Sequence, residues 1–276
     1  MNTSNLQGAR PCLFCGEVGR HSTMEHIVPA SLGNTDDLLE GFVCDTCQSY
    51  LGLKVEKPAL ERTPFGFWKC VLGIRGRTGN LPSFTFEPIA GGVLPSDAGI
   101  TTKGIRFTGV ELGVVSLEVS CEETVRRIMS GRQRGCRVCM SPWHLSVIGR
   151  FLGKMGLEFL ASWNAAAAYD TKQDGIRRFV RYGSHDYLWP IYWGATSEAY
   201  QRTLLVEPHA EWREVDCYTY SLALTKWGHY VFAFNMGLEV WLIDLSSPAP
   251  GVLPETIVQG MTLKCIYYTD WLAHGI

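Results

Sequence analysis

Four cysteines near the start of the chain have the type and spacing of metal ligands. They form two Cys-x-x-Cys pairs, Cys12/Cys15 and Cys44/Cys47, with 28 residues between the pairs. A Cys-x-x-Cys turn can place two thiolates on one side of an ion, so two such turns supply the four ligands of a closed tetrahedral zinc site. A closed site has no open coordination position. This zinc, one ion per chain, would therefore hold the fold together and do no chemistry.

Several different motifs surround these cysteines in a fixed order: Cys-x-x-Cys-Gly at 12–16, Glu-His-Ile-Val-Pro at 25–29, Ser-Leu-Gly at 31–33, Val-Cys-Asp-x-Cys at 43–47 and Leu-Gly at 51–52. Together they resemble the motifs of the HNH endonucleases, also called ββα-metal or His-Me finger nucleases. The resemblance covers about residues 10–58 and is strongest to the subgroup in which four cysteines tie the finger together. The other four-fifths of the chain resembles no family of known function.

The resemblance implies hydrolysis of phosphodiester bonds in nucleic acid, with DNA as the favoured substrate. It assigns His26 as the general base, because a neutral imidazole can take a proton from water near pH 7. It assigns Glu25 as a ligand of a catalytic Mg²⁺ or Mn²⁺, which would stabilise the leaving oxygen as a Lewis acid. Neighbouring strand residues point to opposite faces, so we expect a bulge or turn to bring both side chains to one site.

The family usually has asparagine directly after the last cysteine, and this chain has Gln48 there. Gln48 keeps the amide on a longer side chain, which makes it the candidate for a second metal contact or for bracing the active-site loop. Glu56 is a further candidate ligand, but on a helix over about 45–56 it would lie ~12 Å along the axis from Gln48. We therefore expect Lys54 to contact phosphate and Glu56 to be solvated or to cap the helix.

Composition is typical of a globular protein and not of a disordered one, since 46% of the 276 residues are hydrophobic and 19% are charged. No apolar run reaches the ~18 residues of a membrane span, and the N-terminus lacks the charged-then-apolar pattern of a signal peptide. Ten cysteines without a signal peptide are typical of thiols and metal ligands in a reducing compartment. The sequence therefore predicts a cytoplasmic protein without a membrane segment.

Charge is distributed unevenly along the chain. The net charge of −2 argues against a protein that coats nucleic acid non-specifically. Residues 122–182 carry eleven basic and five acidic side chains, a net of +6, whereas residues 183–276 carry four basic and ten acidic ones, a net of −6. Contacts to phosphate should therefore come from the middle of the chain, and we assign them to Arg177, Arg178 and Arg181.

A third cysteine pair, Cys136 and Cys139, lies in this basic segment, and no fourth pair follows it. Two buried or loop thiols are the favoured interpretation of this pair. A second zinc site, with Cys121 or His144 as a further ligand, is the alternative.

Hydrophobic periodicity predicts mixed secondary structure after the finger. Ser141 and Pro142 are typical of a helix start, and apolar residues at three- and four-residue steps from Leu145 to Phe159 predict a long amphipathic helix. Shorter helices are expected at about 122–131 and 172–182. Strands are expected where apolar and polar residues alternate, within 83–121 and at 189–193, 202–207, 215–224, 229–235, 238–245 and 261–268.

The fold class that follows is α+β: a small zinc-stapled ββα-metal finger, then a larger, mainly antiparallel sheet domain with one long helix. We expect the finger at 1–58, a connecting helix and linker at 59–80, and the sheet domain at 81–276. A finger this small cannot choose a target alone, so the large domain should recognise sequence, bind a regulatory ligand or protein partner, or build a homo-oligomer. Two alternatives to a simple nuclease stay open: a non-catalytic zinc-stapled binding module, and a defence effector nuclease gated through its C-terminal domain.

Overall fold

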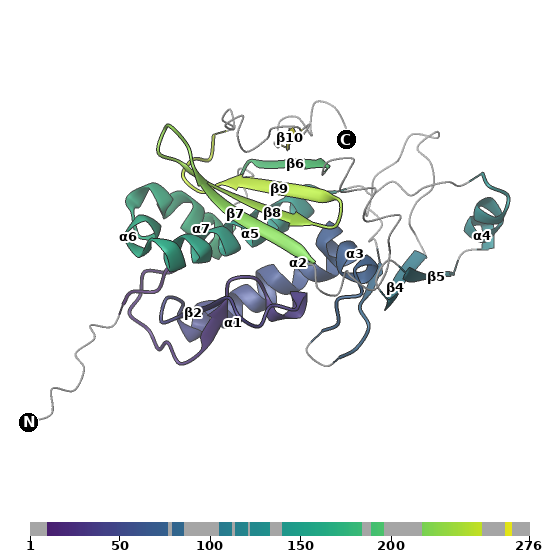
Figure 1. Ribbon diagram of the computed structural model, residues 1–276, viewed down its shortest axis with the longest axis horizontal. Coiled ribbons are helices and arrows are strands. Elements are labelled where there is room, and N and C mark those ends of the chain that lie inside the picture. The colour runs from purple at the N-terminus through teal and green to yellow at the C-terminus, as the bar shows by residue number, and fades with distance from the viewer. Residues whose placement is uncertain are drawn as a thin grey trace, which may run out of the picture.

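The structure is a computed structural model, shown in Figure 1. It describes residues 10–76, 79–85, 105–111, 114–120, 122–132, 140–183, 189–195, 217–249 and 263–266. A small N-terminal ββα unit is followed by a larger antiparallel sheet and one long helix. The α+β class predicted from the sequence is confirmed.

The N-terminal ββα unit, which is the finger predicted from the sequence, consists of two short strands and a helix. Strand β1 (Met24–His26) pairs antiparallel with β2 (Leu38–Glu40), and helix α1 (Asp45–Leu51) follows. Between the strands, the 3-10 helix η1 (Ala30–Leu32) ends at Gly33, whose φ of 87° lies in the left-handed region that favours glycine. The chain therefore turns back soon after the Glu-His pair and leads into the second strand.

Helix α1 does not end where the sequence predicted. The helical run continues through a π-helical segment and then further helices: η2 (Gly52–Glu56), α2 (Lys57–Arg62) and α3 (Pro64–Val71). The helix expected over about 45–56 extends past residue 56, because the wide π turn lets the Lys57 amide donate to Gly52 O, five residues back. Pro58 has no amide hydrogen and lies in the first turn of α2, where proline is tolerated. The expected finger boundary at residue 58 thus lies inside α2, which follows α1 and η2 without a break.

The longest helix is α5 (Pro142–Trp163), of 22 residues. Its predicted start is confirmed: Ser141 is the N-cap, and the Ser141 amide donates to His144 Nδ1 at 3.1 Å. The shorter helices are α4 (Glu122–Met129), α6 (Ala165–Ala168), η3 (Thr171–Gln173) and α7 (Asp174–Tyr182). Within the described part of the chain, no helix combines the length and the apolar character that a membrane crossing requires.

Two further sheets are antiparallel throughout, one of three strands in the order β3–β4–β5 and one of five in the order β10–β6–β9–β8–β7. Their strands are β3 (Ser83–Thr85), β4 (Ile105–Glu111), β5 (Val114–Val119), β6 (Ile191–Ala195), β7 (Tyr218–Leu224), β8 (Tyr230–Met236), β9 (Glu239–Asp244) and β10 (Leu263–Ile266). These positions confirm the predicted strands to within a few residues. The strand expected at 202–207 and the Cys136/Cys139 pair lie outside the described residues.

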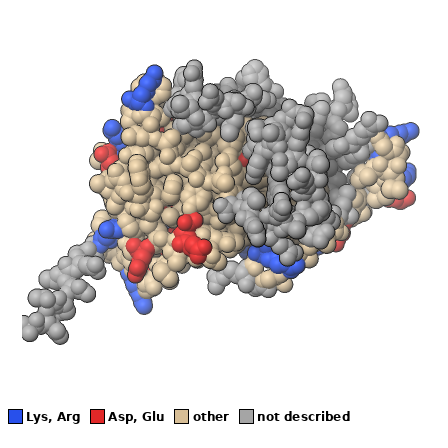
Figure 2. Space-filling model, in the orientation of Figure 1, with Lys and Arg blue, Asp and Glu red and all other residues tan. Residues whose placement is uncertain are grey.

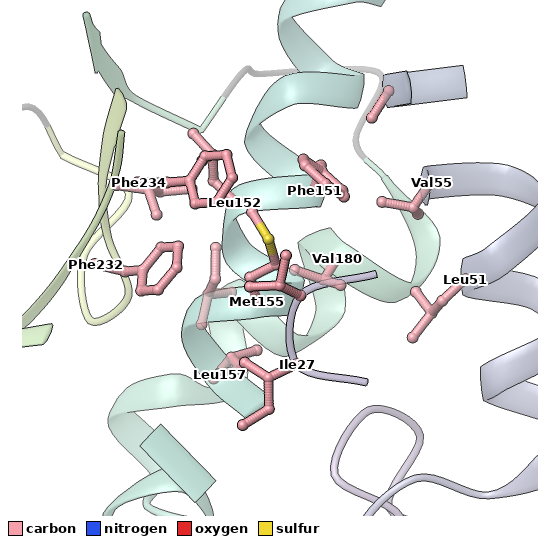
Figure 3. Close-up of a cluster of buried hydrophobic side chains, with 14 of the residues drawn as sticks. Ile27, Leu51, Val55, Phe151, Leu152, Met155, Leu157, Val180, Phe232 and Phe234 are labelled. Atoms are coloured by element: carbon pink, nitrogen blue, oxygen red, sulfur yellow. The ribbon is translucent and has the colours of Figure 1, made fainter. Parts of the chain in front are cut away.

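Helix α5 lies between the finger and the five-stranded sheet (Figures 1 and 3). It packs against Leu51 and Val55 of the finger's helical run on one side and against Phe232 and Phe234 of β8 on the other. Gly156 allows the close approach to β8, since a Cβ there would lie 2.8 Å from the Cβ of Phe232. These side chains belong to one cluster of buried residues. The finger therefore shares its core with the rest of the molecule, and α5 helps to fix where its strands lie.

Candidate metal centre and active site

The four predicted zinc ligands meet at one point of the finger. The Sγ atoms of Cys12, Cys15, Cys44 and Cys47 all lie within 4.8 Å of one another, and those of Cys15 and Cys44 are 3.8 Å apart. Four sulfurs bound tetrahedrally at the usual Zn–S distance of ≈ 2.3 Å would be about 3.8 Å apart. The donor set therefore fits a structural zinc ion. The described residues offer no second group of three or more such ligands.

Short backbone turns bring the sulfurs together. Gly16 closes the first turn with a φ of 75°, and its amide donates to Cys12 O at 2.9 Å. Cys44 is the N-cap of α1, and its Sγ accepts the Cys47 amide at 3.4 Å. The Cys44 amide donates to Cys12 Sγ, also at 3.4 Å. Backbone N–H groups directed at sulfur favour the thiolate, which is the form that binds metal.

The electrostatics of the four thiols also suit a cation. The Cys47 thiol donates to Cys12 and lowers the pKa of Cys12 to about 4, while the same contact and burial raise the pKa of Cys47. Burial also raises the pKa of Cys15. Zinc binding would therefore release the protons that the raised pKa values retain. The guanidinium of Arg181 lies beside Cys47 and would offset part of the negative charge of four thiolates.

Strand β1 presents its three side chains to alternating faces. Glu25 is buried, with 6% of its surface exposed, whereas Met24 is exposed and His26 is half-buried. The strand pairs with β2 in regular register, with Glu25 opposite Leu39 and His26 opposite Leu38. The structure has no bulge at this position, in contrast to the sequence-based expectation. The side chains of Glu25 and His26 consequently point to opposite faces of the strand.

His26 has one accessible ring nitrogen. Nδ1 is buried and has no hydrogen-bond partner among the described residues, which leaves Nε2 as the nitrogen that reaches the surface. The peptide group after His26 is held at both ends. Its carbonyl, His26 O, accepts from Lys154 Nζ at 3.2 Å, and its amide, Ile27 N, donates to Asp37 O at 3.0 Å. An imidazole on a fixed strand with one accessible nitrogen is suited to accept a proton from water.

The amide of Gln48 braces β1 from the side of α1. Gln48 Nε2 donates to Met24 O at 3.0 Å, and Gln48 Oε1 accepts from Thr23 Oγ1. Asp45, at the start of α1, accepts from the Ser22 hydroxyl at 2.6 Å and from the Ser22 amide at 2.8 Å, and these bonds lower the pKa of the Asp45 carboxyl. Of the two roles expected for Gln48, bracing is the one that these contacts serve.

Glu25 belongs to a buried ionic cluster around Lys154, a residue of α5. The Lys154 ammonium is 0% exposed and lies 2.8 Å from one carboxylate oxygen of each of Glu25, Glu56 and Glu158. Burial opposes the charge on Lys154, but the three carboxylates outweigh it and raise the pKa of Lys154 well above its usual range. Burial and the two neighbouring carboxylates raise the pKa of Glu158. The expectation that Glu56 is solvated or caps a helix is wrong, because α5 brings a buried cation against it.

The two residues that the resemblance connects with a catalytic cation do not fit one in this arrangement. One oxygen of Glu25 binds Lys154, and the other, Oε2, is buried without a partner on the face of β1 opposite to His26. Both polar atoms of the Gln48 side chain are bound to the chain in and just before β1. A cation beside His26 would need other ligands or a different placement of Glu25.

Asn34 is a bracing residue that the sequence analysis did not single out. Its Nδ2 donates to Val28 O at 2.7 Å, and its Oδ1 accepts the amides of Asp36 and Asp37, each at 3.1 Å. The buried side chain thus ties the loop after β1 to the end of that strand. The available signal was an asparagine directly after Gly33, because asparagine side chains in turns commonly bond to the backbone two residues on.

The four cations assigned to nucleic acid lie in different settings. Lys54 and Arg178 are exposed. The Arg177 side chain is 13% exposed and donates to two backbone carbonyls, at 2.8 and 3.3 Å. The Arg181 guanidinium lies 3.9 Å from the ring centroid of Tyr50. On the face shown in Figure 2, the described Lys and Arg side chains lie singly and do not gather into a patch. Lys54 and Arg178 are thus accessible to phosphate, whereas Arg177 and Arg181 contact neighbouring parts of the protein.

Comparison with known proteins agrees with the motifs around this site. Residues 12–64 match the family model of the HNH endonucleases. The matched stretch contains the four cysteines, both strands of the finger and the helical run as far as the start of α3. No curated protein and no solved structure gives a significant match to the chain.

Proposed function

We propose that this chain, whose residues 12–64 form an HNH endonuclease domain, is a nuclease that hydrolyses phosphodiester bonds in nucleic acid. DNA is the substrate that we favour. The observation that carries the proposal is His26, an imidazole with one accessible nitrogen on a braced strand. It lies at the position that the resemblance assigns to the general base.

In the proposed reaction, His26 Nε2 accepts a proton from water while the water oxygen attacks phosphorus and the bond to the leaving oxygen breaks. Gln48 and Asn34 hold β1 and the following loop, so the imidazole is already oriented when the substrate arrives. Zinc would be held by the four cysteines and would stabilise the finger without touching the substrate. The resemblance implies that the reaction also uses Mg²⁺ or Mn²⁺. Because Glu25 and Gln48 do not fit such an ion here, we assign it no ligand.

Contacts to the substrate are proposed at the exposed cations Lys54 and Arg178, which can neutralise phosphate charge. The sheet domain is proposed to recognise the substrate or a regulatory ligand. The finger's cysteines are free thiols that can bind metal, which is consistent with a reducing compartment, and we therefore favour the cytoplasm.

A non-catalytic binding module is the second candidate function. The ionic cluster favours it, because Lys154 binds the Glu25 carboxylate that the resemblance assigns to a cation. In this case, zinc, Gln48 and Asn34 would form a scaffold for binding, and His26 would have no catalytic role.

A cleavage assay separates these functions. Purified protein is incubated with duplex DNA, single-stranded DNA and RNA, with Mg²⁺, with Mn²⁺ and without a divalent cation. The proposal predicts cleavage by the wild-type chain in the presence of a divalent cation. Cleavage that requires added cell extract would identify a gated nuclease. Binding without cleavage in every condition, by folded protein that contains zinc, would favour the binding module.

A further inference from the structure

Three charged residues of α5 are directed at the finger or at residues that contact it. Arg150, Lys154 and Glu158 follow one another at four-residue steps, which places them on one side of a helix. Arg150 Nη2 donates to the Tyr50 hydroxyl at 3.1 Å. Lys154 pairs with Glu25 of β1 and with Glu158 of its own helix, each at 2.8 Å. The apolar core helix predicted from the sequence therefore also carries a polar stripe, and this stripe meets the finger.

Lys154 contacts the backbone of the proposed base directly. Its Nζ donates to His26 O at 3.2 Å and lies 2.8 Å from Glu25 Oε1, so it holds two neighbouring residues of β1. The peptide group that contains His26 O also donates through Ile27 N to Asp37 O at 3.0 Å. Because the imidazole is attached next to this peptide group, a shift of the peptide group would move the ring.

The opposite side of α5 packs on the five-stranded sheet. Gly156 approaches Phe232 of β8 closely, and the rings of Phe159 and Tyr220 meet edge to face with centroids 4.9 Å apart. Figure 3 shows α5 between β8 and the finger's helical run. Since α5 is one continuous helix, a movement of the sheet that carries α5 with it would also move Lys154 and β1.

We propose that Lys154 is a positioning residue for the nuclease reaction, and that through Lys154 the sheet domain sets the geometry of His26. This inference rests on the proposed function. Lys154 is fully buried and cannot touch a substrate, so its effect reaches the reaction only through β1. The active nuclease would therefore require α5 in addition to residues 12–64. A ligand that moves the sheet would change the rate by moving Lys154.

Two variants and one control test this proposal. Lys154→Met removes the charge and keeps a long unbranched side chain. Lys154→Met combined with Glu158→Leu removes a cation and a carboxyl group from the same helix. The double variant therefore leaves fewer buried charged groups without a partner than Lys154→Met alone does. Lys172→Met, at an exposed cation, is the control. For each protein, kcat and KM for DNA are measured together with zinc content and hydrogen exchange at the amides of Ile27 and Gly16.

The double variant is expected to fold and to lower kcat by roughly 10- to 100-fold, with KM and zinc content unchanged, because misplacing a catalytic group costs rate and not binding. The Ile27 amide should exchange faster than in the wild type, whereas the Gly16 amide beside the cysteines should keep its rate. The control should match the wild type in every measurement.

Wild-type kcat and wild-type exchange at Ile27 in a folded double variant would overturn the proposal. Failure of both Lys154 variants to fold would also overturn it, since Lys154 would then be a requirement of folding and not of positioning. If the wild-type chain cleaves no substrate, the proposed nuclease function is contradicted. Exchange at Ile27 still shows in that case whether Lys154 holds β1.

Discussion

The finger is held by two anchors that differ in range and in chemistry. The first is the cysteine cluster, whose four ligands all come from residues 12–47 and suit a zinc ion. The second is the ionic cluster, in which Lys154 reaches His26 O across 128 positions of the sequence. The first anchor joins the turn before β1 to the start of α1. The second joins β1 and η2 to the helix that carries the large sheet.

The difference between the anchors indicates a difference in role. A structural zinc ion supplies folding free energy, because the unfolded chain has no preformed site. A buried ion pair contributes little net stability compared with apolar packing, but removing one partner is costly. We therefore assign the folding of the finger to the first anchor and the placement of His26 to the second.

The largest effect is expected from breaking the first anchor. Cys12→Ser combined with Cys47→Ser should remove zinc, unfold the finger and abolish cleavage, because the binding free energy of such sites is folding free energy. Elemental analysis should find about one zinc per wild-type chain and none in the variant. Cys70→Ala, at a buried thiol of α3 outside the cluster, should keep its zinc. A wild-type chain that contains no zinc and reacts freely at these thiols would contradict the first anchor.

The anchors also differ in how far the sequence could predict them. Cys-x-x-Cys spacing is a local pattern, so it identifies a metal site before any fold is known. The start of α5 was equally predictable, because Ser141 and Pro142 act through the first turn of the helix. Lys154 could only be recognised as lying off the apolar stripe of α5. Its partners Glu25 and Glu56 are set by how the finger packs on α5, which no local pattern specifies.

Two predictions for the finger, those for Glu56 and for Glu25, were wrong for the same physical reason. The helix continues past Pro58 because a π turn rearranges the hydrogen bonds before it, and this turn places Glu56 where Lys154 can reach it. Glu25 was expected to share a site with His26, yet a regular strand places the two on opposite faces. In both cases the buried cation of α5 provides the partner for the carboxylate, and the sequence around the finger contains no sign of it.

An intermediate effect, on the pH dependence of stability, is expected from replacing Glu158 of the second anchor by a neutral residue. Burial raises the pKa of Glu158, so the neutral form of its carboxyl is favoured more in the folded chain than in the unfolded one. The stability that this neutral form provides is fully present below the usual pKa of 4.5 and is lost as pH rises toward the raised folded value. Glu158→Gln is neutral at every pH. The variant should therefore become more stable relative to the wild type as pH rises, by at most about 1.4 kcal/mol per pH unit.

Chemical denaturation at several pH values between about 4 and 8 measures this difference. Glu61→Gln, at an exposed residue of α2, is the matched control and should run parallel to the wild type. A profile for Glu158→Gln that also runs parallel to the wild type would mean that folding does not raise the pKa of Glu158.

The smallest effect is expected on α7, outside both anchors. Arg178→Ala should weaken DNA binding by a few-fold and reduce the slope of log K against log salt by about 1, because one phosphate contact is lost. Arg177→Ala is the comparison on the same helix. Its guanidinium is bound to backbone carbonyls, so the substitution should lower stability and leave the salt slope unchanged. Fluorescence anisotropy of a labelled duplex, titrated at several salt concentrations, provides both slopes. Equal slopes for Arg178→Ala and the wild type would show that Arg178 of α7 does not contact the DNA phosphates.

The roles assigned to both anchors depend on His26 of β1 being the general base. The most direct test is the single-turnover cleavage rate of His26→Ala beside that of the wild type. We expect the rate to fall by ~10²–10⁴-fold, while zinc content, thermal unfolding and DNA binding stay at their wild-type values, because the His26 side chain makes no hydrogen bond in the described structure. A folded His26→Ala protein that contains zinc and cleaves at the wild-type rate would contradict the account and place the catalytic centre outside the finger.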